Sequence, residues 1–143
     1  MSEEFYPMPL FVRMFVRDVA VSAQWYANAF GFRSVYALSD VNGRQTMNHI
    51  RLAKYQDLML LAQPQDTTDE PSSRLSLSFS YDGSLGALAQ RALSAGATVG
   101  GPTVMPYNAY ELTVIDPNGF ILIFSQLINV DRPIADIRSS INP

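Results

Sequence analysis

The feature that most constrains the fold is a repeated pattern of one helix and several strands. One helical pattern begins at Asp18 and ends at Gly31, and a second of similar length runs from about Ser84 to Gly96. Asp and Ser are favoured at helix starts, and Gly is favoured just after helix ends. Each helix follows one strand pattern and precedes about three. Two copies of one unit in 143 residues indicate a pair of modules that share a sheet.

Strand signals divide the chain further. The turn 116–119 (DPNG) leads into an unbroken apolar run, which is typical of a strand buried on both faces. A Pro/Gly-rich segment follows Thr98 and Val99, so only a short strand is expected there. We expect a single domain over residues 1–143. It would contain a first module at 9–62, a polar linker at 63–74, a second module at 75–126, and a tail at 127–143 with a short helix.

Composition excludes several functional classes. The chain has no cysteine, which removes disulfides, thiolate nucleophiles and cysteine metal ligands. Its net charge is −3 with only 10 Lys and Arg and no basic run, so nucleic acid is not an expected partner. The acidic start has no long apolar segment after it. A secretory signal or membrane span is therefore not expected, and the predicted location is cytoplasmic.

Several motifs resemble the vicinal oxygen chelate superfamily of glyoxalase I, bleomycin-resistance proteins and extradiol dioxygenases. The first-module signature is matched by the residues 15–18 (FVRD), 25–26 (WY) and 30–32 (FGF). The second-module signatures are matched by 92–97 (ALSAGA) and 116–119 (DPNG). The resemblance implies an α+β fold in which two βαβββ modules form a curved, cup-shaped mixed sheet. It also implies a homodimer.

The same resemblance implies four positions for metal ligands. In this chain they hold Phe11, Met59, Ser76 and Ile123, with Leu75 as the alternative to Ser76 if Asp82-Gly83 carries no bulge. Phenyl, thioether and alkyl groups are not usable ligands for Zn, Fe, Ni or Mn, and a serine hydroxyl is a poor one. The prediction is therefore no metal and no other cofactor, as in the bleomycin-resistance-like branch.

Without a metal, the expected site is an apolar cup with a few polar groups, which suits a planar or aromatic small molecule. Strand alternation puts the first-module residues of this cup on one face, and His49 and Arg51 enter from the third strand. Tyr107 and Tyr110 enter from the loop and strand that cover the cup. The predicted ligand-binding residues are Phe11, Arg13, Phe15, His49, Met59, Ser76, Tyr107, Tyr110, Ile121 and Ile123.

Three functional hypotheses follow. The first is metal-free binding of a small aromatic or natural-product ligand, in resistance or sequestration. The second is a metal-free lyase or isomerase that uses His49 or Tyr110, with Arg13 as an anion clamp. The third is a metal-dependent glyoxalase or dioxygenase whose ligands lie elsewhere. We expect Arg13 to be a buried charge, and a buried charge needs a partner. The partner is either a ligand carboxylate, or Glu111 or another acid of the chain. The alternative for His49 is a structural or surface role.

Overall fold

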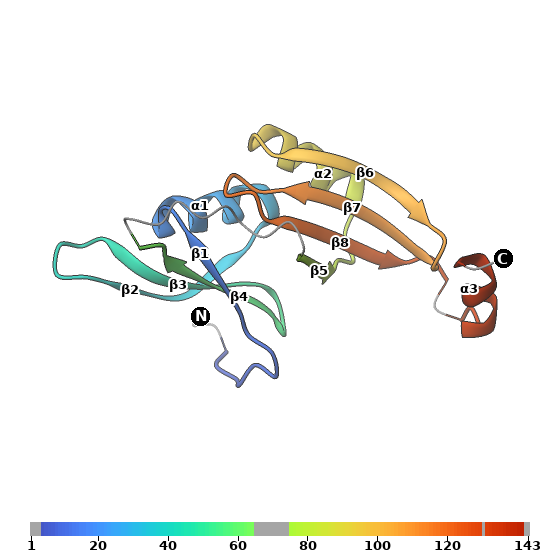
Figure 1. Cartoon of the computed structure of the whole chain (residues 1–143), viewed down its shortest axis with the longest axis horizontal. Helices are drawn as coiled ribbons and strands as arrows, with labels where there is room; N and C mark the ends of the chain where they lie inside the picture. The colour runs from blue at the N-terminus through green and yellow to red at the C-terminus, as the bar shows by residue number, and fades with distance from the viewer. Residues whose placement is uncertain (1–3, 65–74, 130, 142–143) are drawn as a thin grey trace. The chain divides into compact units, whose positions relative to one another are not determined.

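The first unit of the chain is a helix packed on a four-stranded sheet. The computed structural model describes residues 4–64, 75–129 and 131–141 and divides into two units, Met1–Glu70 and Pro71–Pro143. The first contains β1 (Val12–Val16), α1 (Val19–Phe30), β2 (Arg33–Ser39), β3 (Gln45–Ala53) and β4 (Gln56–Ala62). The strand order is β1-β4-β3-β2 (Figure 1). β1 is parallel to β4, and the other neighbouring strands are antiparallel.

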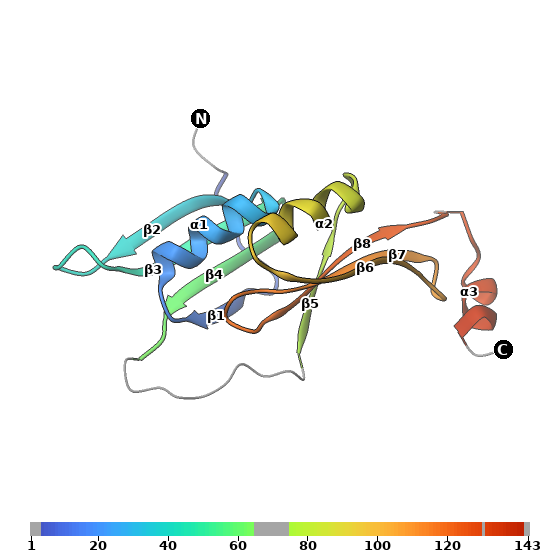
Figure 2. The same ribbon diagram turned by 90° about the horizontal axis from the view of Figure 1, so that it is seen from above.

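Helix α1 begins and ends where the sequence predicts. The Asp18 side chain accepts a hydrogen bond from the Val21 backbone amide, and Gly31 closes the helix in the left-handed region with φ 84°. The helix lies across β3 and β4 (Figure 2). In β1, buried residues alternate with exposed ones, which is the normal strand periodicity, whereas residues 47–51 of β3 are all buried. The buried core of this unit is formed by Met14, Val16, Val19, Tyr26, Ala29, Phe30, Phe32, Ile50, Leu58 and Leu60.

The second unit repeats this arrangement. It contains β5 (Ser76–Ser80), α2 (Leu85–Ser94), β6 (Thr98–Met105), β7 (Ala109–Ile115), β8 (Ile121–Leu127) and α3 (Ile134–Ile141). The strand order is β5-β8-β7-β6, with β5 parallel to β8. Ser84 caps α2, which packs on β6 and β7. The core of this unit is formed by Phe79, Leu85, Leu88, Ala89, Ala92, Leu112, Val114, Leu122 and Phe124.

The predicted α+β fold class is confirmed, since each unit has the strand-helix-three-strand order and a mixed sheet. The described strands form two four-stranded sheets, one in each unit, instead of the single shared sheet that was expected. The prediction of a short strand at Thr98-Val99 is wrong, because β6 continues to Met105. Gly101 takes a φ of 92°, which only glycine adopts readily, and the pairing with β7 shifts register between Gly100 and Thr103. The irregularity is thus a bulge within a long strand.

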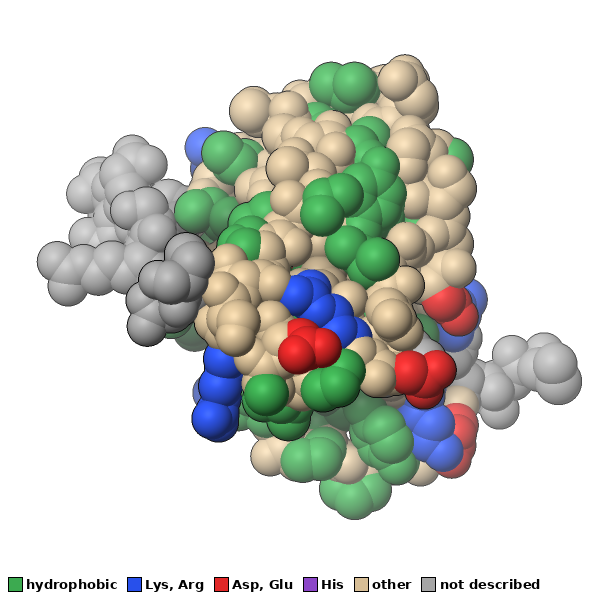
Figure 3. Space-filling view, turned by 90° about the vertical axis from the view of Figure 1, so that its right-hand side faces the viewer, with side chains coloured by type: hydrophobic (Ala, Val, Ile, Leu, Met, Phe, Trp, Pro, Cys, Tyr) green, Lys and Arg blue, Asp and Glu red, His purple; other side chains and the backbone are tan. Residues whose placement is uncertain are grey.

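The tail contains the helix α3, which has no buried residue. Its Ile134 and Ile141 are 68% and 52% exposed. Figure 3 shows one face of the molecule, on which acidic, basic and hydrophobic side chains lie next to one another. Across the described ranges, no helix is both long and apolar enough to cross a membrane.

Candidate functional site: the open face of the first sheet

One face of the first sheet is not covered by α1, and we call it the open face. On β1 its side chains alternate with those that pack against the helix: Met14 and Val16 point toward α1, while Arg13 and Phe15 point away. Phe15 is 52% exposed. Cross-strand pairing forms a continuous row of Arg13, Met59, His49 and Tyr36 over the four strands. The open face comprises Phe11, Arg13, Phe15, Tyr36, Leu38, Met47, His49, Arg51, Asp57, Met59 and Leu61.

A buried group of charged side chains lies at one end of this face. Asp57 pairs with Arg51 across the β3–β4 hairpin. Its carboxylate accepts hydrogen bonds from Arg51 Nε at 3.0 Å and Nη2 at 2.9 Å, in the bidentate geometry that suits a guanidinium. His49 Nε2 lies 2.7 Å from Asp57 Oδ2. The Asp57 side chain is 0% exposed, so its charge is balanced by these partners rather than by water.

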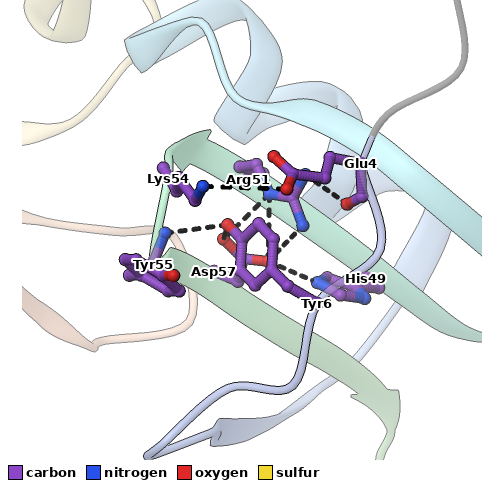
Figure 4. Close-up of polar contacts among 7 residues, drawn as sticks. All are labelled: Glu4, Tyr6, His49, Arg51, Lys54, Tyr55 and Asp57. Carbon is purple, nitrogen blue, oxygen red and sulfur yellow. Dashed lines mark hydrogen bonds and ion pairs between the residues drawn. The ribbon is translucent and has the colours of Figure 1, made fainter.

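The segment that precedes β1 covers this group (Figure 4). The Tyr6 hydroxyl donates to Asp57 Oδ1 at 3.2 Å and accepts from the Tyr55 backbone amide at 2.8 Å. The Arg51 guanidinium lies 4.3 Å from the centre of the Tyr6 ring, and its Nη1 donates to the backbone carbonyl of Glu4 at 2.8 Å. These contacts exclude water from Asp57 and hold residues 4–6 against the sheet.

Two pKa values are shifted in this group. Burial by itself would raise the pKa of Asp57, but hydrogen bonds from Arg51 and His49 outweigh it and lower that pKa below its ordinary value of 3.8. Burial raises the pKa of the Tyr6 hydroxyl, and the charge of Asp57 adds to the rise. Asp57 is therefore an anion at neutral pH, and Tyr6 is a neutral donor.

The ionised carboxylate determines how His49 is protonated. Since Asp57 only accepts hydrogen bonds, Nε2 of His49 must carry a proton to donate to it. In the neutral ring, Nδ1 then has the free lone pair. The imidazole lies between the rings of Phe11 and Tyr36, with centroids 4.8 Å and 5.9 Å away. This arrangement orients the ring and resembles the way a carboxylate positions a histidine that acts as a base.

Of the predicted ligand-binding residues, the structure brings Phe11, Arg13, Phe15, His49 and Met59 to this open face. The expectation that Arg13 is buried is wrong, because the side chain is exposed. Its strand position explains why: it alternates with residues that face α1 and so projects from the uncovered side.

The predicted residues of the second unit divide between the two faces of its sheet. Ser76 pairs with Ile121, and Ile123 lies two residues further along the same face, which is turned away from α2. Tyr110 lies on the same face of β7 as the buried Leu112 and Val114, two and four residues further on, and this is the other face of the sheet from Ile121 and Ile123. Tyr107 donates a 2.5 Å hydrogen bond to Glu111, and this bond raises the pKa of the tyrosine. The structure thus does not group Tyr110 with the two isoleucines.

The residues at the four family metal positions do not fit a metal. Phe11 and Met59 lie on the open face, with a phenyl ring and a thioether. Ser76 and Ile123 lie on β5 and β8, with a hydroxyl and an alkyl group. This set lacks the imidazole and carboxylate ligands that divalent ions need. Elsewhere in residues 4–64, 75–129 and 131–141, no three His, Asp or Glu side chains gather in a way that could hold an ion.

Sequence reasoning missed the role of Asp57. Asp57 is the second residue of β4, which begins directly after the turn Lys54-Tyr55. Tyr55 has a φ of 65°, and the tight reversal places Arg51 directly opposite Asp57. Symmetric counting from this turn would pair Leu52 with Asp57, and the register shift between Arg51 and Ala53 brings Arg51 there instead, so the sequence carries no simple signal for the pair. No local signal points to Tyr6, which reaches the site from outside the sheet.

Comparison with protein families gives one match. The model of the Glyoxalase/Bleomycin resistance protein/Dioxygenase superfamily matches residues 10–124, most of the chain. No curated protein gives a significant match.

Several solved structures have a similar fold. TioX from Micromonospora sp. ML1 has a TM-score of 0.65 at 17% identity, over 81% of this chain and 93% of that one. A glyoxalase-related enzyme from Clostridium phytofermentans has a TM-score of 0.66 at 16% identity, over 87% and 98%. TnmS3, an antibiotic binding protein from Streptomyces sp. CB03234, has a TM-score of 0.63 at 21% identity, over 82% and 93%. At these identities the likeness concerns the fold alone.

Proposed function

Because the chain belongs to the glyoxalase/bleomycin resistance protein/dioxygenase superfamily, we propose that it binds a small aromatic or natural-product ligand without a metal. The role would be sequestration or resistance. The observation that carries this proposal is the open face of the first sheet, where Phe15, Tyr36 and Leu38 are 52%, 37% and 53% exposed. Apolar side chains gathered on one face of a sheet favour a partner that covers them.

Two further observations support the proposal. The donor set at Phe11, Met59, Ser76 and Ile123 favours contact with apolar groups over coordination of an ion. A protein of similar fold, TnmS3, is described as an antibiotic binding protein. Aromatic rings such as Phe15 and Tyr36 stack readily on planar ligands.

A neutral aromatic dye tests this proposal. N-phenyl-1-naphthylamine should bind saturably, with increased fluorescence, and EDTA should not change its affinity. Phe15→Ala should weaken binding roughly threefold to tenfold, since an aromatic pair contributes about 0.5–1.5 kcal/mol. The control Val21→Ala removes an exposed apolar group from α1, outside the open face, and should leave affinity unchanged. Absence of saturable binding, or binding that EDTA abolishes and zinc restores, would contradict the proposal.

The second candidate function is a metal-free lyase or isomerase. The 2.7 Å contact between His49 and Asp57 favours it, because the carboxylate orients the ring and leaves Nδ1 able to accept a proton from a bound molecule. Tyr110 is a weaker candidate for this role, since it lies on the opposite face of its own sheet from Ile123.

Turnover of a co-purified molecule distinguishes the two functions. The small molecules released from purified protein would be incubated with fresh enzyme and followed by mass spectrometry. If the protein is an enzyme, His49→Gln should retain binding but lower turnover at least about a hundredfold, the usual contribution of a general base. Glutamine can still donate to Asp57 but has no basic nitrogen. Equal turnover by the wild-type protein and by His49→Gln would exclude His49 as the base.

A further inference from the structure

The open face carries a cation, Arg13, on its edge strand β1. Arg13 is exposed, and its strand neighbours on this face are Phe11 and Phe15. Its cross-strand partner in β4 is Met59. Among the described residues of the first unit, no hydrogen bond or ion pair engages the Arg13 guanidinium. A charged group is thus surrounded by aromatic and thioether side chains.

The acidic side chain of the open face, Asp57, already has hydrogen-bond partners within the first unit. Both oxygens of Asp57 accept hydrogen bonds, Oδ1 from Arg51 and Tyr6 and Oδ2 from Arg51 and His49. The side chain is fully buried beneath residues 4–6. Asp57 therefore serves the buried group, and the guanidinium of Arg13 keeps its donors available to a molecule that lies on the face.

We infer that the ligand is an aromatic anion, with a ring that packs on the open face and an acidic group that pairs with Arg13. The guanidinium fork matches the planar oxygens of a carboxylate and also binds sulfonate or phosphate. A ring that covers Phe15 and Met59 would bring its acidic substituent to Arg13 and exclude water from the pair, which strengthens it. This inference rests on the proposed binding function and specifies the class of ligand.

Two dyes with the same rings test the charge alone. 1-Anilinonaphthalene-8-sulfonate is N-phenyl-1-naphthylamine with one sulfonate added. The wild-type protein should bind the sulfonate dye about tenfold more tightly than the neutral one, as one charge-assisted hydrogen-bonded pair allows. Arg13→Gln should weaken the sulfonate dye about tenfold and change the neutral dye less than about twofold. Arg13→Lys should restore part of the lost affinity, since it keeps the charge without the fork.

Arg138→Gln is the matched control, because it removes the same charge from an exposed position on α3. It should leave the affinity for both dyes at the wild-type value, with thermal unfolding confirming that each variant is folded. If the neutral dye binds and Arg13→Gln leaves the sulfonate dye unchanged, the inference is wrong and the proposed function stands. If neither dye binds the wild-type protein, both are overturned.

Discussion

Replacing Asp57 with alanine is expected to lower the free energy of unfolding by about 3–5 kcal/mol, the usual cost of removing one partner of a buried ion pair. The Asp57 side chain is 0% exposed and that of Arg51 is 4% exposed. The variant leaves the Arg51 guanidinium buried without its carboxylate and removes the acceptor of His49 and Tyr6. Urea unfolding followed by circular dichroism measures the change.

The exposed ion pair between Lys54 and Glu4 is the control. Its atoms are 3.7 Å apart, and the side chains are 57% and 62% exposed. Glu4→Gln should cost less than about 1 kcal/mol, because exposed pairs contribute little. It also keeps the backbone carbonyl that accepts from Arg51. If Glu4→Gln and Asp57→Ala lower the free energy of unfolding by similar amounts, burial does not determine how much an ion pair contributes to stability.

The pH dependence of unfolding gives a second measurement on the same residue. The pKa of Asp57 is lower in the folded chain than its ordinary value of 3.8. The unfolded chain therefore binds a proton first, so the stabilisation is complete above pH 3.8 and is lost as pH falls through the lowered pKa. As pH falls below 3.8, the wild-type protein should therefore lose stability more steeply than Asp57→Asn. If the stabilities of the wild-type protein and Asp57→Asn fall in parallel with pH, the lowered pKa of Asp57 does not contribute to stability and the prediction is wrong.

Replacing Phe124 with alanine is expected to destabilise the second unit by about 3–5 kcal/mol, the range for truncating a buried phenylalanine. Phe124 is 0% exposed and stacks on Phe79, with ring centroids 5.4 Å apart and planes at 19°. The edge of Tyr81 lies against the same ring. Chemical unfolding of the variant measures the loss.

Phe15→Ala is the matched comparison. This phenylalanine also lies on a strand, but it is 52% exposed and faces away from α1. Its truncation should cost about 0.5 kcal/mol or less, as for most exposed positions. A protein that keeps its stability in Phe15→Ala but loses affinity for the neutral dye would separate the binding role of the open face from any structural one. Equal destabilisation by the two variants would mean that Phe15 is part of a core.

Much of the fold followed from local signals in the sequence. Asp18 and Gly31 were predicted as the ends of α1, and they cap it as expected. Strand alternation predicted that Arg13 and Phe15 share one face of their strand, and both are exposed while Met14 between them is buried. These features depend on backbone periodicity and capping, which involve residues close together in the chain. The family motifs rest on the same local patterns.

The candidate site depended on contacts that local signals do not encode. Alternation placed Arg13 opposite Met14, but only the position of α1 decided that the Arg13 side is uncovered. The partner of Arg51 and His49 became clear only from the register of the β3–β4 hairpin. Tyr6 reaches Asp57 although the two residues are 51 positions apart in the chain.

The sequence by itself therefore determined the two repeated units, the helix ends and the two faces of each strand, because each follows from the geometry of a few consecutive residues. Only the tertiary structure decided which face is covered and which charges are neutralised. Those outcomes depend on cross-strand register and on segments packing from a distance, and these leave no periodic trace in the chain.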